Sequence, residues 1–108
     1  MTDNSMTSNP YLAQQVKTAT PEKLILMLYA QGMKSCQAQD NQKAVKILTE
    51  LIAALNFEYN EIAGSMFDLY RYALDEVHKR NFDNAYVVFE GMHDIWENVV
   101  MKQQMDVA

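Results

Sequence analysis

From residue 21 onward, apolar residues recur at intervals of three and four positions, which is the spacing of one face of an α-helix. The first predicted helix runs over residues 21–39, and three more follow it. We expect the apolar stripes of these later helices to face a shared core. The stripes are Ala44, Leu48, Leu51 and Leu55; then Ile62, Met66, Leu69, Ala73 and Val77; and then Ala85, Val88, Met92, Ile95 and Val99.

The first helix has a clear start signal and a very apolar body. Thr20 can accept a hydrogen bond from the free amides of the first turn, and Pro21 suits the first helical position. Glu22 places negative charge at the positive end of the helix dipole. Residues 24–30 are then apolar at seven consecutive positions. A surface helix needs one apolar stripe, so more than one face of this helix requires cover, part of it from outside the bundle.

Short joints connect the predicted helices. Turns are expected at residues 40–42, with Asp40 or Asn41 as the next helix cap, and at residues 81–83. The joint at residues 55–61 contains no Gly or Pro. Asn56 could end one helix there and Asn60 could cap the next, or both could lie in one continuous helix. A continuous helix would open the hairpin and invite a domain-swapped dimer. We favour the turn.

Four amphipathic helices with short joints predict an all-α fold, an antiparallel up-down four-helix bundle over residues 20–103. Residues 1–19 are expected to form a flexible, extended N-terminal arm. The first eight are polar, and Tyr11, Leu12 and Val16 supply apolar anchors further along. Residues 104–108 are expected to fray.

Composition and charge exclude several function classes. The formal net charge of −5 over 108 residues argues against nucleic acid and anionic membranes as partners. No apolar run is long enough to span a bilayer, and the polar N-terminus is unlike a signal peptide. Cys36 is the one cysteine, which fits a reducing cytoplasm. We expect it to be a small buried apolar residue rather than a nucleophile.

A carboxylate-bridged metal site is the sharpest enzymatic hypothesis. Glu90 and His93 have the Glu-x-x-His spacing of such sites, and Asp75 and His78 offer an Asp-x-x-His spacing on the neighbouring helix. If the chain turns near residue 81, the two histidines differ in height by about 14 Å, too far apart to share one metal centre. We therefore expect no metal, no cofactor and no enzymatic activity.

Several sequence blocks occur together in an unusual combination. They are Asn9-Pro10-Tyr11, Val16, Thr18-Ala19-Thr20-Pro21-Glu22-Lys23-Leu24, Leu26-Met27-Leu28-Tyr29, Leu55-Asn56, Glu61-Ile62-Ala63, Leu69-Tyr70 and Asp94-Ile95-Trp96-Glu97. In this order they resemble the flagellar secretion chaperones of the FliS family. The arm and the first helical hairpin, residues 21–55, are shorter than is usual in that family.

The resemblance implies a cytoplasmic export chaperone. Such a protein binds the disordered C-terminal segment of flagellin, which prevents premature polymerisation and supports flagellar secretion, and the flagellar export gate is a further partner that the resemblance allows. The client is expected to displace the arm. The alternative is a self-associating helical adaptor bundle without flagellin binding, so the chain is a monomer or a homodimer. The residues expected to bind the client are Tyr11, Val16, Leu24, Ile25, Leu28 and Tyr29.

Overall fold

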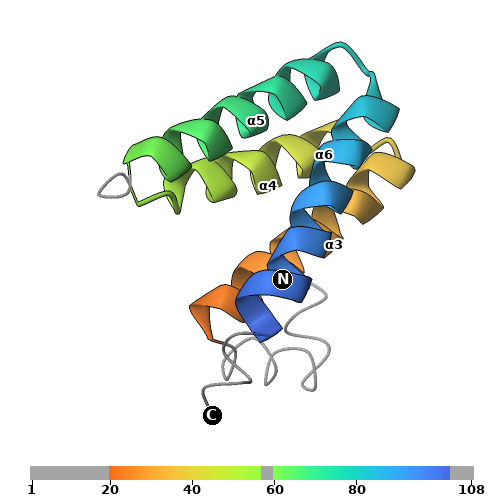
Figure 1. The fold of residues 1–108 in the computed structure, drawn as a ribbon. Helices are drawn as coiled ribbons and strands as arrows, with labels where there is room; N and C mark the ends of the chain where they lie inside the picture. The colour runs from red at the N-terminus through yellow and green to blue at the C-terminus, as the bar shows by residue number, and fades with distance from the viewer. Residues whose placement is uncertain (1–19, 57–59, 103–108) are drawn as a thin grey trace, which may run out of the picture.

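The computed structural model describes residues 20–56 and 60–102 (Figure 1). The predicted arm, residues 1–19, and the predicted frayed end, residues 104–108, lie outside these ranges. The described chain forms α3 (Pro21–Gln37), α4 (Asn41–Ala53), α5 (Asn60–His78) and α6 (Phe82–Ile95), and a short π-helix, η1 (Trp96–Met101), continues α6. Within these ranges the predicted fold class, an all-α four-helix bundle, is confirmed.

The four helices form two pairs that meet at one end. α3 packs against α4 and α6, and α5 packs against the same two helices. In Figure 1, the α4–α5 pair extends one way from the α3–α4 and α5–α6 joints, and the α3–α6 pair extends another way from the same joints. The described chain is accordingly broad and thin, with extents of 41 × 36 × 22 Å. All four helices therefore share a core near those joints, and the two pairs diverge away from it.

We call the end of the bundle that contains the α3–α4 and α5–α6 joints the closed end. The two joints there have the same backbone geometry. Gln39 and Arg80 have positive φ angles of 54° and 66°, the left-handed conformation that often ends a helix. In each joint the following residue, Asp40 or Asn81, donates its backbone N–H to the carbonyl five positions earlier at 2.8 Å. The same two residues are the N-caps of α4 and α6. The turns predicted at residues 40–42 and 81–83 are thus confirmed, but both lie slightly earlier in the chain than predicted, because α4 already begins at Asn41 and α6 at Phe82.

Local capping follows the sequence prediction. The Thr20 hydroxyl accepts a hydrogen bond from the Lys23 amide at 3.2 Å, and the Asp40 carboxylate accepts one from the Lys43 amide at 3.1 Å. α4 ends at Ala53, α5 begins at Asn60, and the two helices pack against each other. The chain therefore turns back between them, as expected, rather than continuing as one helix.

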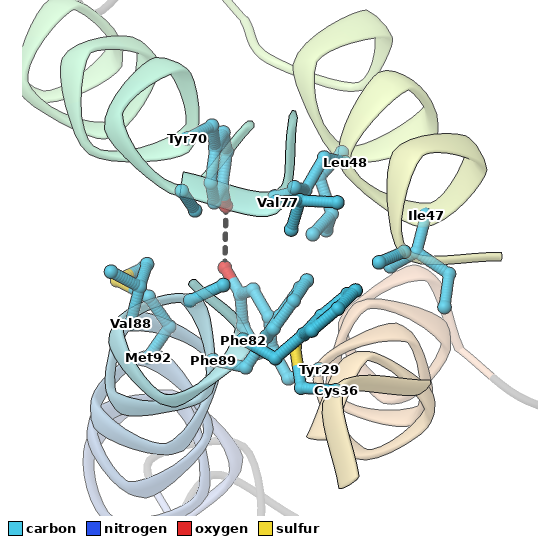
Figure 2. Close-up of a cluster of buried hydrophobic side chains, with 14 residues drawn as sticks. Tyr29, Cys36, Ile47, Leu48, Tyr70, Val77, Phe82, Val88, Phe89 and Met92 are labelled. Carbon is cyan, nitrogen blue, oxygen red and sulfur yellow. Dashed lines mark hydrogen bonds between the residues drawn. The ribbon is translucent and has the colours of Figure 1, made fainter. Parts of the chain in front are cut away.

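The buried core lies mainly in the helix halves nearest the closed end. Cys36 belongs to it, which confirms the prediction of a buried apolar cysteine. α3 and α6 approach closely at Gly32, where an added Cβ would overlap the ring of Phe89. Figure 2 shows the centre of this core. Its members are Tyr29, Cys36, Ala44, Ile47, Leu48, Leu51, Tyr70, Ala73, Val77, Phe82, Ala85, Val88, Phe89 and Met92.

Two of the predicted core stripes are only partly buried. On α5, Ile62 is 65% exposed and Leu69 is 37% exposed. In the stripe that begins on α6, the last two residues, Ile95 and Val99, are 57% and 49% exposed. The prediction of core positions was wrong for these four residues. The physical reason is the divergence of the helix pairs (Figure 1), because α5 leaves α6 before either stripe ends.

Candidate interaction surface

The structure places the predicted binding residues of α3 in different environments. Leu24 is 36% exposed, at the surface of the first turns of the helix. Ile25 and Leu28 are half-buried and pack against the edge of the core. Tyr29 is fully buried. In this structure, Leu24 is thus the most accessible of the four, and Tyr29 lies beneath the surface rather than on it.

Tyr29 joins α3 to α5 across the core. Its hydroxyl lies 2.6 Å from the hydroxyl of Tyr70, which is also buried (Figure 2). Its ring meets the edge of Trp96 with the centroids 5.9 Å apart and an interplanar angle of 77°. Burial raises the pKa of both tyrosines above the ordinary value of 10.0. Tyr29 is therefore a neutral structural residue that supports the α3 surface from behind.

The start of α3 is tied to the end of the described chain. The indole Nε1 of Trp96 donates a hydrogen bond to the backbone carbonyl of Glu22 at 2.8 Å, a contact between residues 74 positions apart. This bond fixes the first turn of α3, and with it Leu24, against η1. The two predicted arm residues, Tyr11 and Val16, lie outside the described residues, and the chain enters the described structure beside this contact.

A buried carboxylate holds the closed end together. Glu76 of α5 accepts hydrogen bonds from the side-chain amides of Asn84, at 2.6 Å, and Asn81, at 3.4 Å, and pairs with Lys79 at 3.5 Å. The hydrogen bond from Asn84 is the largest cause of a lowered pKa for Glu76. Because Asn84 lies on α6, this cluster fixes which flanks of α5 and α6 face each other.

A second exposed apolar region lies on α5, on α6 and on η1, which continues α6. We call it the α5–α6 face and define it by Ile62, Leu69, Tyr72, Ile95 and Val99, each at least 37% exposed. Sequence reasoning missed this face because it assigned most of these residues to the core. The helical spacing of apolar residues is the same whether a stripe is covered by its own bundle or by another molecule.

The described residues offer little for metal or thiol chemistry. Among them, no three His, Cys, Asp or Glu side chains lie close enough together to hold a metal ion. Burial raises the pKa of the Cys36 thiol to about 11, so little thiolate is present at neutral pH. No described helix is long and apolar enough to cross a membrane.

The fold and its exposed apolar residues define a small helical bundle with surfaces suited to packing against another helix. Comparison with protein families identifies the family within this class. The model of the flagellar protein FliS family matches residues 3–104, and the chain belongs to that family. No curated protein and no solved structure matches the chain.

Proposed function

We propose that this protein is a cytoplasmic flagellar export chaperone that binds the disordered C-terminal segment of flagellin. The match to the FliS family over residues 3–104 carries the proposal. In this role the protein keeps newly made flagellin from polymerising before export. The flagellar export gate is then a second partner, and the bundle acts by binding rather than by catalysis.

The surface chemistry supports binding of a helix that forms on contact. A disordered segment loses conformational entropy when it folds against a partner, so it needs a broad apolar surface in return. Leu24 is exposed on α3, and Ile25 and Leu28 lie beside it at the edge of the core. Trp96 holds the backbone beneath them through Glu22. In the proposal, a client helix packs on this fixed surface and displaces the arm residues Tyr11 and Val16.

Calorimetry with a synthetic peptide of the flagellin C-terminal segment tests this function. We expect saturable heat and a rise in the melting temperature of the full-length protein, because a ligand that binds only the folded state stabilises it. No heat and no shift at high micromolar peptide would refute the proposal. Light scattering of the protein alone gives its mass; a dimer without peptide binding would favour the self-associating adaptor instead.

A pair of matched variants locates the binding surface. Leu24→Ser removes an apolar contact that the client should cover, and a loss of roughly 1.4 kcal/mol corresponds to about tenfold weaker binding. Val87→Ser removes a side chain that is 64% exposed in the first half of α6. This position is away from the Trp96 end of the helix, where Leu24 lies, so the substitution should leave the affinity for the client unchanged. Equal effects of the two substitutions would count against a client surface at Leu24.

A further inference from the structure

The hydrogen bond between Glu76 and Asn84 gives the orientation of the α5–α6 face. It joins the two helices at 2.6 Å and so marks the flank of α5 that faces α6 and the flank of α6 that faces α5. On α5, residues on the same flank lie four, seven and fourteen positions before Glu76. They are Tyr72, Leu69 and Ile62.

The matching flank of α6 continues in the same way. Residues four, seven and eleven positions after Asn84 are Val88, Gly91 and Ile95. Figure 2 shows Val88 on the side of α6 that faces α5. Val88 is buried near the closed end, whereas Ile95 is 57% exposed. An added Cβ at Gly91 would meet no atom within 4 Å, so this flank of α6 is open from Gly91 onward.

Together, these flanks give two apolar rows, one on α5 and one on α6, which begin near each other at the closed end and diverge with the two helices (Figure 1). We call the two rows together the strip. The α5 part, from Ile62 to Tyr72, is about 15 Å long, or nearly three helical turns. Its side chains are 65%, 37% and 47% exposed at Ile62, Leu69 and Tyr72. Large apolar residues exposed in a row of this kind are typical of a surface that another helix covers.

The charges that border the strip are acidic on both sides. On α5, Glu61 and Asp68 directly precede Ile62 and Leu69; on α6, Glu90 and Asp94 directly precede Gly91 and Ile95. A residue one position earlier lies about 100° around the helix, on the solvent side of the strip. All four acidic residues are exposed.

The cations on α5 and in the segments that follow α5 and α6 mostly lie away from this border. Arg71 lies over the ring of Phe67, 5.8 Å from its centroid, and Lys79 pairs with Glu76 at the closed end. Lys102 lies at the far end of the described chain. The border of the strip therefore carries negative charge along most of its length, and it favours a partner that brings positive charge.

We propose that the α5–α6 face binds an amphipathic helix of a second protein whose apolar stripe is flanked by Lys or Arg residues. The partner's apolar residues cover Ile62, Leu69 and Ile95, and its cations pair with the acidic border. This surface is separate from the one around Leu24, and the inference does not depend on flagellin being the client.

Two model peptides test the proposal on the full-length protein. Each is a synthetic helix of about 14 residues with leucine on one face. One peptide carries lysine at all remaining positions, and its counterpart carries glutamate at those positions. We expect the leucine–lysine peptide to bind at least tenfold more tightly than the leucine–glutamate peptide. Equal binding of the two peptides would overturn the proposal.

Variants separate this face from the rest of an acidic protein. Ile62→Ser with Ile95→Ser should weaken leucine–lysine binding at least tenfold, and both side chains are more than half exposed, so the fold should be retained. Glu61→Lys with Asp68→Lys should weaken leucine–lysine binding and strengthen leucine–glutamate binding. Gln42→Ser, at an exposed position on α4 outside both proposed surfaces, serves as the control that keeps wild-type affinity for the lysine peptide. An unchanged affinity in the isoleucine variant would show non-specific attraction only and refute the proposal.

Two other occupants are also distinguished by experiment. If light scattering shows a dimer that the Ile62→Ser, Ile95→Ser variant converts to a monomer, a second copy of this chain covers the face and the proposal is wrong. If replacing Tyr11 and Val16 by serine raises the affinity for the lysine peptide tenfold, the chain's own arm occupies the face, which also overturns it. Binding of the flagellin peptide is measured separately, so either result leaves the proposed chaperone function intact.

Discussion

The buried pair of tyrosine hydroxyls allows a sharp test of how α3 is joined to α5. Tyr29 and Tyr70 are 0% and 2% exposed, and their hydroxyl oxygens lie 2.6 Å apart. Replacing Tyr70 by phenylalanine leaves the Tyr29 hydroxyl in the core without this partner. A buried polar group that loses its partner costs about 1–3 kcal/mol. We therefore expect each single Tyr→Phe substitution to lower the free energy of unfolding by about that amount.

The double variant should be more stable than the two single effects predict. With both hydroxyls gone, no polar group is left unpaired, and replacing both partners by apolar groups of the same shape is nearly neutral. The double-mutant cycle should therefore give a coupling free energy of at least about 1 kcal/mol between the two positions. Tyr72→Phe is the control, because Tyr72 is 47% exposed and its change should stay within about 0.5 kcal/mol.

Urea unfolding, followed by circular dichroism, measures these free energies. Trp96 fluorescence gives a second probe, since its ring contacts Tyr29. For a domain of this size, each 1 kcal/mol should also shift the melting temperature by about 4–8 °C. Single variants as stable as wild type, or a double variant whose loss equals the sum of the single losses, would refute the buried hydroxyl pair.

The pH dependence of stability tests the same pair independently. Because burial raises the pKa of Tyr29 and Tyr70 above 10.0, the folded state favours the neutral phenols. Their contribution to stability is present below pH 10 and is lost as the pH rises above it, since only the unfolded chain ionises readily there. The double Tyr→Phe variant should lack this alkaline loss of stability. An identical alkaline profile for wild type and variant would argue against buried phenols.

Three further predictions follow from the core and the closed end. Gly32→Ala should destabilise the fold by about 1–2 kcal/mol in urea unfolding, because overlap with Phe89 outweighs the gain in helix propensity. Gly91→Ala, with open space around it, should instead stabilise the fold by up to about 1 kcal/mol. Equal effects of the two substitutions would contradict the close contact between α3 and α6 at Gly32. Since the pKa of Glu76 is lowered below 4.5, its stabilising effect should be present above pH 4.5 and decline as the pH falls further. The difference in free energy of unfolding between wild type and Glu76→Gln should therefore narrow in acid, and a constant difference would count against a stabilising Glu76 carboxylate. At pH 8 a thiol-reactive dye should label Cys36 at least roughly 100-fold more slowly in the native protein than in denaturant, because its pKa is about 11 rather than 9.0, and equal rates would place the thiol outside the core.

Local features of the fold could be predicted from sequence in detail. The caps at Thr20 and Asp40 depend on hydrogen bonds to residues three positions away, so the sequence contains both partners of each bond. The closed-end turns were also predictable, although the left-handed residues Gln39 and Arg80 are not the glycines that usually mark such positions. Signals confined to a few neighbouring residues were therefore sufficient for the helix order and for where helices start, whereas the first helix ends at Gln37 rather than at residue 39.

The candidate surface was harder to predict, as Tyr29 illustrates. An apolar run containing a tyrosine fits either a core or an interface, because the ring is apolar and the hydroxyl is polar. Its place in the core depends on Tyr70, 41 positions further along the chain, and on Trp96. Neither contact has a local sequence signal. The predicted surface on α3 thus remains a proposal centred on Leu24, with Tyr29 as its support.

The exposed half of α5 shows what helical spacing leaves undetermined. Ile62 and Ala73 belong to one apolar stripe, yet Ile62 is 65% exposed and Ala73 is fully buried. The difference comes from how the neighbouring helices are joined. The Gly32 approach and the Trp96 hydrogen bond hold α3 and α6 together along their length, whereas the Glu76 cluster joins α5 to α6 near the joint. Because the angle between the pairs depends on these distant contacts, one stripe forms core near the joint and an exposed apolar face beyond it.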